Sequence, residues 1–342
     1  MLKNLLANDI GIDLGTASVL VYVKDKGIVL REPSVVAIDT DADKIIRIGR
    51  EAQQMLGRTP KNIVTVRPLK NGVISQYDVT LKMLQYFIRR ACGNTLIRPR
   101  VMICVPTGIS EIEERAVIDA ANQAGARHTM IIEEPVAAAI GAGIDINEPN
   151  GHLIVDIGGG TTDIAVISYG GVVVSESIKV AGDKFDEAII NYIKSNYKVL
   201  IGERTAEMIK IKICSALDDG KPRSIEVKGR DLVKGLPRMV SFSSAETLAA
   251  LIDPITAILD AICRVIEKTP PELIADVYRN GIVMTGGGSM LRGLDRLVER
   301  TTGMRARLAN DPISCVALGT GRSLENIKDD SLLGALFSRK KK

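Results

Sequence analysis

Short apolar runs that end in glycine-rich turns are the main pattern of this chain. The clearest example begins with the apolar run 153–155, passes through Gly158-Gly159-Gly160 and resumes as the apolar run 164–166. Runs this short, bounded by turn residues, predict buried strands rather than helices. We therefore expect a strand, a tight turn and a second strand over this stretch.

The same layout occurs near the start of the chain. Residues 9–21 contain an apolar run, Asp13, the pair Gly15-Thr16 and a second apolar run. Each copy continues with another turn, at 24–27 and at 168–171, and with a third apolar run. Internal repetition of this kind predicts two related domains, which we expect to face each other across one cleft.

Apolar residues at helical spacing separate the groups of strands. Residues 79–91 carry such a face, and Ser110 with Glu113 forms a capping box that opens a helix to about Ala124. Pro254 must kink or divide the helix expected at 244–268. Further helices are expected at 51–56, 137–142, 185–193, from 205, from 270 and at 315–325, with a loop at 67–72 and loops with short strands at 218–237.

The glycine turns suggest a phosphate site. Three glycines let the backbone approach a ligand closely and adopt dihedrals that a Cβ would forbid, while backbone N–H groups and the hydroxyls of Thr161 and Thr162 can bind an anion. Asp156 would repel a phosphate directly, but it suits a hydrated Mg²⁺ between them. The alternative is a tight hairpin whose aspartate caps its own turn.

Repetition favours the phosphate interpretation, because Asp13 stands in the first turn where Asp156 stands in the second. A third glycine turn, Gly286-Gly287-Gly288, also follows an apolar run and precedes a helix-like segment, where backbone amides favour anions. Three such turns and two matching aspartates predict a nucleoside triphosphate bound with a metal.

Composition excludes several other classes of protein. The 342 residues exceed one ordinary core, and 46% apolar with 25% charged residues is usual for a globular protein. A net charge of +4 and only 3% aromatic residues argue against nucleic-acid binding. Five scattered cysteines without a C-x-x-C pair and two histidines give no zinc site or hydrolytic triad, and no run approaches the length of a membrane span. We expect a cytoplasmic protein with reduced thiols.

The motifs resemble those of the actin, sugar-kinase and heat-shock-chaperone ATPase superfamily. The resemblance lies in residues 13–16, 156–162 and 285–289. Within the superfamily, the chain is most similar to the MreB/Mbl family of bacterial actin homologues. That similarity covers almost the whole chain and is most specific at 27–37, 132–139, 202–207 and 268–273.

This resemblance implies an actin-like α/β fold. Two RNase H-like large domains would flank a nucleotide cleft, each with a small inserted subdomain. The implied division places subdomain IA at 1–31, 66–145 and 316–342, IB at 32–65, IIA at 146–182 and 243–315, and IIB at 183–242.

The resemblance also implies roles for individual residues. Glu134 would orient the water that attacks the γ-phosphate of ATP, with Thr161 as the second catalytic residue, although Glu133 and Glu134 could each merely cap a helix. Asp13 and Asp156 would hold Mg²⁺ through water. The implied nucleotide-binding set is Asp13, Gly15, Thr16, Ala17, Ser18, Asp156, Gly158, Gly159, Gly160, Thr161, Thr162, Asp183, Glu207, Lys210, Gly286, Gly287, Gly288 and Ser289.

Two of these assignments have a structural alternative. Glu207 and Lys210 would bind the ribose and adenine, but one helical turn apart they could equally form a surface ion pair. Leu96 and Ile97 lie in a loop flanked by arginines, where two apolar residues could tuck under a strand. The resemblance instead implies that they insert into a membrane, and the ends 1–6 and 332–342 could also touch lipid.

The implied function is that of a filament rather than a metabolic enzyme. ATP would favour a homopolymer of paired protofilaments on the inner face of the cytoplasmic membrane, with weak ATPase activity coupled to assembly. Such filaments would organise the cell-wall elongation machinery and so determine cell shape. The main alternative is a small-molecule phosphotransferase of the sugar-kinase type, for which the sequence offers no separate substrate aspartate.

Overall fold

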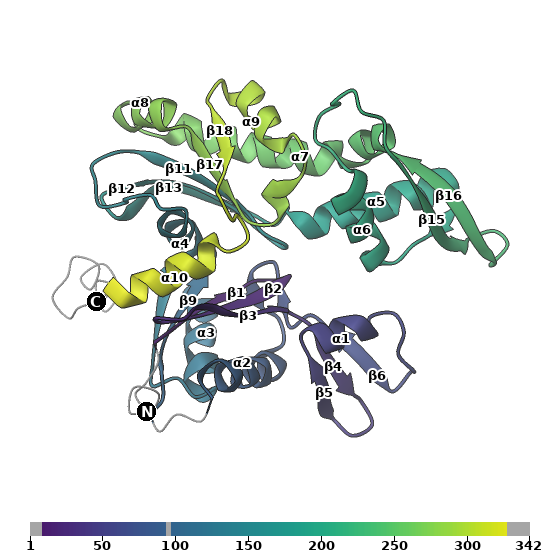
Figure 1. Ribbon diagram of the computed structural model, residues 1–342, viewed down its shortest axis with the longest axis horizontal. Helices are drawn as coiled ribbons and strands as arrows, with labels where there is room; N and C mark the ends of the chain where they lie inside the picture. Colours follow the sequence, from purple (N-terminus) through teal and green to yellow (C-terminus); the bar gives the residue numbers. More distant parts are fainter. Residues whose placement is uncertain (1–8, 94–96, 327–342) are drawn as a thin grey trace.

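The computed structural model describes residues 9–93 and 97–326, which form two stacked halves (Figure 1). The first half is built on a five-stranded sheet in the order β10-β9-β1-β2-β3. Strands β1 to β3 form an antiparallel meander, and β9 and β10 continue the sheet in parallel from β1. The strands are β1 (Ile10–Leu14), β2 (Ser18–Val23), β3 (Gly27–Pro33), β9 (Arg100–Val105) and β10 (His128–Glu133).

The second half repeats this sheet, in the order β13-β12-β11-β17-β18. Its strands are β11 (His152–Ile157), β12 (Thr162–Ser168), β13 (Gly171–Ile178), β17 (Ile282–Thr285) and β18 (Ala306–Leu308). Even an irregularity recurs, because the register shifts between Val21 and Tyr22 in one meander and between Val166 and Ile167 in the other. The predicted repetition of the two halves is therefore confirmed.

Each half carries a small sheet of its own on the right of Figure 1. In the first half it comprises β4 (Val36–Asp39), β5 (Lys44–Ile48) and β6 (Ile63–Val66), with helix α1 (Arg50–Met55). In the second half it comprises β14 (Val199–Leu200), β15 (Ser224–Asp231) and β16 (Pro237–Ser243), with helices α5 (Gly182–Tyr197) and α6 (Glu203–Ile213) beside it. The expectation of only short strands at 218–237 was wrong, since β15 has eight residues and pairs with β16.

Amphipathic helices cover the outer face of each large sheet. Helices α2 (Tyr77–Cys92) and α3 (Glu111–Gln123) pack on the first. On the second, α7 (Ser244–Lys268) contacts β12 and β13, while α8 (Pro271–Asn280) contacts β11 and α9 (Leu294–Thr302) contacts β18. The capping box is confirmed: Ser110 Oγ accepts from the Glu113 amide at 3.3 Å, and the Glu113 carboxylate accepts from the Ser110 amide at 2.8 Å. Pro254 does not divide α7, which is one helix of 25 residues.

Two helices join the halves. Helix α4 (Glu134–Gly141) leads from the first half to the second, and α10 (Cys315–Asn326) returns. They pack backbone to backbone: a Cβ on Gly141 would lie 1.8 Å from the carbonyl oxygen of Cys315, and one on Gly319 would lie 1.8 Å from that of Ala137. An apolar cluster shared by both sheets surrounds this contact.

Two local expectations need correction. Helix α4 begins at Glu134 rather than at Ala137, because Pro135 is tolerated in the first turn of a helix. The expected loop at 67–72 contains a hairpin of β7 (Leu69–Lys70) and β8 (Val73–Ile74). Asn71 and Gly72 connect these strands with φ values of 51° and 77°, as a tight two-residue turn requires.

No helix in the described ranges 9–93 and 97–326 combines the length and apolar character needed to cross a bilayer.

Candidate functional site

Two aspartates mark where the repeated sheets meet, Asp156 buried and Asp13 half-buried. Asp13 lies near the end of β1 and Asp156 near the end of β11, so the repeat brings one from each half. Burial raises the pKa of each carboxyl to about 7, against an ordinary value of 3.8. The charged forms are therefore costly here until a cation approaches.

Two more buried carboxyl groups lie beside them. Glu134 is the first residue of α4, and its pKa is raised well above the usual range by burial and by the charges of Asp163, Asp156 and Asp13. Asp163 stands opposite Asp156 in the antiparallel pair of β11 and β12, so both side chains lie on one face. Its pKa is also raised, mainly by burial. Acids from both halves thus share one site.

Asp13 and Asp156 each accept a hydrogen bond from a residue on the neighbouring parallel strand. Thr285 Oγ1 donates to Asp156 Oδ1 at 2.6 Å, and Cys104 Sγ donates to Asp13 Oδ1 at 3.5 Å. These donors occupy equivalent places in the repeat, on β17 beside β11 and on β9 beside β1. Fixed donors hold each carboxylate in one orientation.

The first glycine turn is fastened to its own half. Gly72 N donates to Thr16 Oγ1 at 2.9 Å, which places the hairpin tip of β7 and β8 beside the turn. Ser34 Oγ donates to the carbonyl oxygen of Gly15, and Ser34 N donates to that of Ala17. Ser18 begins β2 directly after the turn.

The second glycine turn lies against the first. A Cβ on Gly159 would lie 2.6 Å from the Cβ of Ala17, and a Cβ on Gly160 would lie 2.5 Å from Thr16 Oγ1. None of Gly158, Gly159 and Gly160 has a positive φ. Close approach between the halves, rather than the unusual dihedrals expected from the sequence, therefore accounts for Gly159 and Gly160.

The second turn is also linked to helix α5. Asp183 N donates to the carbonyl oxygen of Gly159 at 2.8 Å, while Thr162 Oγ1 donates to that of Val180. The Thr162 hydroxyl is thus engaged in holding the strand, whereas Thr161 faces the first half, with its Cγ2 near Gly72.

The third glycine turn packs under the second. Gly286 has a φ of 82°, and a Cβ there would lie 2.2 Å from the carbonyl oxygen of Ile157, so no other residue fits. Ser289 Oγ donates to the carbonyl oxygen of Gly286 at 2.7 Å. The expected helical segment is a 3₁₀ turn, Gly288–Met290, and the α-helix begins only at Leu294.

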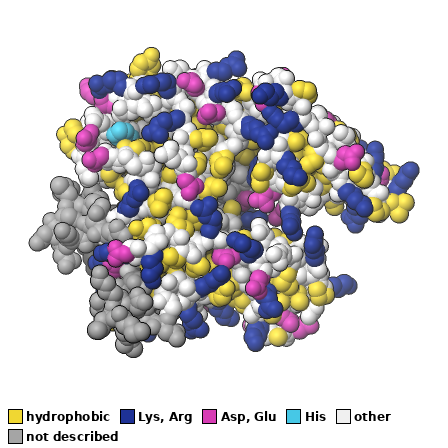
Figure 2. All heavy atoms as spheres, in the orientation of Figure 1, with side chains coloured by type: hydrophobic (Ala, Val, Ile, Leu, Met, Phe, Trp, Pro, Cys, Tyr) yellow, Lys and Arg dark blue, Asp and Glu magenta, His cyan; other side chains and the backbone are white. Residues whose placement is uncertain are grey.

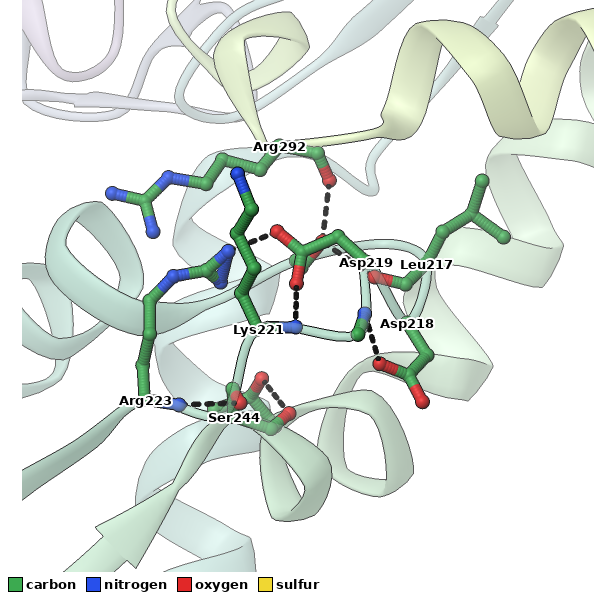
Figure 3. Close-up of polar contacts among 10 residues, drawn as sticks. Leu217, Asp218, Asp219, Lys221, Arg223, Ser244 and Arg292 are labelled. Atoms are coloured by element: carbon green, nitrogen blue, oxygen red, sulfur yellow. Dashed lines mark hydrogen bonds and ion pairs between the residues drawn. The ribbon is translucent and has the colours of Figure 1, made fainter.

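Beyond α6, a loop ties the second small sheet to this third turn (Figure 3). Ala216 N and Ser215 Oγ donate to the carbonyl oxygen of Arg292 at 2.7 and 3.1 Å. Within the loop, the Asp219 carboxylate pairs with the Arg223 guanidinium and accepts from Lys221 N at 3.1 Å. The segment that carries Glu207 and Lys210 is therefore held close to the third glycine turn.

Lys210 does not form the surface pair with Glu207 that the sequence allowed. Its Nζ contacts Asp186 at 2.7 Å and the carbonyl oxygen of Gly182 at 2.9 Å. Asp183 lies in the same group, because Lys210 and Glu207 both influence its pKa, which burial raises. Lys210 is thus positioned at the start of α5, next to the second turn.

The acids fit a hydrated cation better than a directly coordinated one. Within the described ranges, no group of three or more His, Cys, Asp or Glu side chains is arranged to hold a metal ion directly. Asp13 and Asp156, one carboxylate from each half, suit Mg²⁺, which keeps several of its waters and takes one or two carboxylates. Figure 2 shows the surface notched between the right-hand arms of the two halves, with acidic side chains toward its inner end.

The apolar pair of the arginine-flanked loop is only partly described. Ile97 is 39% exposed, so it does not tuck under a strand. Leu96 lies outside the described residues, as do the segments 1–6 and 332–342.

Sequence reasoning missed four contributors to the site: Thr107, Cys104, Thr285 and the turn Asn71-Gly72. The last had a clear signal, because Asn-Gly between short apolar runs predicts a two-residue hairpin. The other three become visible only when strands far apart in sequence are placed side by side.

Comparison with known proteins agrees with this geometry. The family described as MreB/Mbl protein matches residues 7–331. The chain is 52% identical to the cell shape-determining protein Mbl of Bacillus subtilis (strain 168), over 94% of this chain and 97% of that protein. It is 51% identical to the cell shape-determining protein MreB of Escherichia coli (strain K12), over 98% of each.

A solved structure shows the same fold. The crystal structure of MreB 5 of Spiroplasma citri bound to AMPPNP aligns with a TM-score of 0.90 at 40% identity, over 95% of this chain and 98% of that one. The fold is therefore actin-like, as the sequence predicted. With a family match over nearly its whole length, two repeated sheets and a glycine turn on each, the chain belongs to the MreB/Mbl family of bacterial actin homologues.

Proposed function

We propose that this chain binds ATP with Mg²⁺ between its two halves and assembles into membrane-attached filaments that organise cell-wall synthesis and cell shape. The observation that carries the proposal is the meeting of half-buried Asp13 with buried Glu134 and Asp156 beside two touching glycine turns. Support also comes from relatives named cell shape-determining and from a structure of a relative bound to AMPPNP.

Each residue would have a distinct task. Asp13 and Asp156 would anchor Mg²⁺ through its waters, and the ion would neutralise phosphate charge when bound. Backbone amides of Gly15 to Ser18 and of Gly158 to Thr161 would bind the phosphates. Glu134, on the first turn of α4, would orient the attacking water, with Thr161 opposite it on the other half.

The remaining predicted residues would hold the nucleoside. Glu207 and Lys210 come from α6, and Gly286 to Ser289 come from the third turn, which the loop in Figure 3 keeps close to α6. Asp183, at the start of α5, would complete this side. Ribose and adenine would lie between these elements.

Filament formation would bring ATP hydrolysis to the membrane surface. Subunits would form paired protofilaments on the inner face of the cytoplasmic membrane and would contact the cell-wall elongation machinery. Leu96 and the exposed Ile97 would enter the lipid. A single subunit would bind weakly and a filament strongly, because each added subunit multiplies the contacts.

Electron microscopy and turnover together test this proposal. With ATP and vesicles containing anionic lipid, filaments should cover the vesicles, and ATP turnover per subunit should rise with protein concentration. The rival, a sugar-kinase-type phosphotransferase, predicts turnover that rises with an added sugar instead. Absence of filaments together with such a sugar response would refute the filament function.

The membrane contact has its own test. Leu96→Ser combined with Ile97→Ser should abolish co-sedimentation of filaments with vesicles while assembly continues, because two buried apolar side chains contribute roughly 1.5–3 kcal/mol each. Truncation after Asp330 should weaken binding and make it less sensitive to salt. Parent-like pelleting of the double serine variant would move the anchor to the chain ends.

A further inference from the structure

Asp163 is a buried acid for which the proposed reaction has no task. It is the second residue of β12 and only 1% exposed. In the other half, the residue opposite the aspartate is Leu20, which pairs with Asp13 as Asp163 pairs with Asp156. Leucine can occupy this position of the repeat, so the fold does not require a carboxyl group there. Burial of an unpaired carboxyl group is costly, and we therefore expect specific hydrogen bonds to Asp163.

Ser177 and Thr161 hydrogen-bond to this carboxyl from its own half, and a further contact comes from the opposite half of the molecule. Thr107, which follows β9, donates both its backbone N–H and its hydroxyl to Asp163 Oδ1, at 3.0 and 3.1 Å. Both residues are buried. Another contact between the halves, from Arg67 to Glu203 at 4.0 Å, involves an exposed carboxylate and contributes little. The Thr107–Asp163 pair is therefore a water-excluded tie between the halves.

The tie lies next to the carboxylate that would direct water. Strands β9 and β10 are parallel, with Glu133 opposite Val105, so Glu134 and Thr107 leave the same edge of the first sheet. Burial raises the pKa of Glu134, and among the neighbouring charges that of Asp163 raises it most. Whatever fixes Thr107 relative to the second half therefore also fixes Glu134 relative to the second glycine turn.

Neighbouring contacts make the tie part of a compact unit. A Cβ on Gly72 would lie 2.4 Å from Pro106 Cγ and 3.2 Å from Thr161 Cγ2, so the hairpin tip, the β9 end and the second turn touch. Gly72 in turn donates to Thr16 on the first turn. Separation of the halves would break the Thr107 bonds and the contact of Gly72 with Thr161 together, while the contacts of Gly72 with Pro106 and Thr16 lie within the first half.

We propose that the Thr107–Asp163 pair couples closure of the two halves to the placement of Glu134, which makes Asp163 a positioning residue for hydrolysis. The proposal rests on the ATPase function proposed above. A closed cleft needs the tie intact, and nucleotide release needs it broken. Loss of the tie should therefore speed ADP release and lower kcat, with a smaller effect on KM for ATP.

Three variants separate the tie from the charge. Asp163→Leu introduces the residue found at the equivalent place in the first half and removes the acceptor. Asp163→Asn removes the charge but keeps an oxygen that can accept from Thr107. Thr107→Val removes the hydroxyl and leaves the backbone donor.

Amide hydrogen exchange at Thr107, without nucleotide, tests the tie directly. Exchange should be roughly tenfold faster in Asp163→Leu than in the parent, the scale of losing a hydrogen bond to a charged group, and nearly unchanged in Asp163→Asn. Equal exchange in Asp163→Leu and the parent would show that the tie does not form. Because exchange is measured without nucleotide, its result does not depend on whether the chain hydrolyses ATP.

ADP release and steady-state hydrolysis test the coupling. Asp163→Leu should release a fluorescent ADP analogue about tenfold faster and lower kcat by about the same factor, Thr107→Val should lie between, and Asp163→Asn, which keeps the acceptor, should release the ADP analogue within about twofold of the parent rate. If Asp163→Asn is as impaired as Asp163→Leu, the charge matters and the tie does not. If Asp163→Leu releases ADP like the parent, the coupling is refuted. A parent that does not hydrolyse ATP would instead refute the proposed function, and the coupling with it.

Discussion

The first and second glycine turns have the same backbone arrangement but different side chains around their aspartates. Both follow the first strand of an antiparallel meander whose second and third strands shift register, and both have an aspartate near the strand end. Asp156 receives a hydroxyl at 2.6 Å from Thr285, whereas Asp13 receives only a thiol at 3.5 Å from Cys104. Across the hairpin, Asp156 faces Asp163, but Asp13 faces Leu20.

This difference shows how a repeated fold can supply an asymmetric site. Strand order and turn geometry follow from backbone pairing, which tolerates many side chains. Reactivity follows from single side chains at strand ends, which each half can change without loss of fold. The first half supplies Glu134, and the second supplies the better-anchored aspartate.

Among these variants, removal of the Glu134 carboxylate, which only the first half supplies, should have the largest effect on the rate of hydrolysis. In Glu134→Ala, ATP should still bind, but phosphate release by assembled protein should slow by roughly two orders of magnitude or more, the scale of a positioned base. Glu133→Ala, one residue earlier, is the matched control and should release phosphate like the parent. Parent-like hydrolysis in Glu134→Ala would leave this residue with only a structural role at the start of α4.

Asp156→Ala and Asp13→Ala compare the two metal-side carboxylates. Asp156→Ala should weaken ATP binding in Mg²⁺ by about a hundredfold, and Asp13→Ala by less, because groups that merely support a metal ligand already change affinity 10–100-fold. Binding in EDTA should change little in either variant. ATP titrations with and without Mg²⁺ provide the measurement, and parent-like affinity of Asp156→Ala in Mg²⁺ would disprove its metal role.

Substitution of Thr285 or Cys104, which donate to these aspartates, should have a smaller effect on ATP affinity. Thr285→Val removes a short hydrogen bond and should lower Mg²⁺-dependent ATP affinity roughly tenfold. Cys104→Ala removes a long thiol contact and should lower it by no more than about threefold, since thiols are weak donors. Equal losses in the two variants would mean that the halves contribute alike.

The pH dependence of stability tests the buried environment of these carboxyls without any ligand. The folded pKa values of Asp13 and Asp156, about 7, exceed the ordinary value of 3.8, so between these limits the folded state binds more protons than the unfolded state. The free energy of unfolding without nucleotide should therefore fall as pH rises from about 4 to 7, by at most about 1.4 kcal/mol per pH unit for each group.

Urea unfolding across this pH range gives the measurement. Asp13→Asn should flatten the slope, because an amide does not ionise. Bound Mg²⁺-ATP should also flatten it by stabilising the charged carboxylates. A parent whose stability rises with pH over this range would contradict the raised pKa values.

Much of the fold was predictable because it depends on local patterns. Apolar runs before Asp13 and Asp156 gave the strands, the repeat gave the two halves, and Ser110 with Glu113 gave a helix start. The contact of Thr107 with Asp163 was not predictable, because 56 residues and two different sheets separate them. Similarly, the need for glycine at 159 lies in Ala17 of the other half, which no local rule reveals.

The close contact of helices α4 and α10 has a mechanical consequence. Gly141 and Gly319 bring the two backbones together, so no flexible side chains lie between them to absorb movement. Helix α4 is also the element whose first residue is Glu134. Its second half, from Ala137 to Gly141, is therefore fixed against α10, and its first residue carries the carboxylate. Any rotation that neighbouring subunits impose on the two halves would shift that carboxylate directly, so contacts made at a distance could set the rate of hydrolysis.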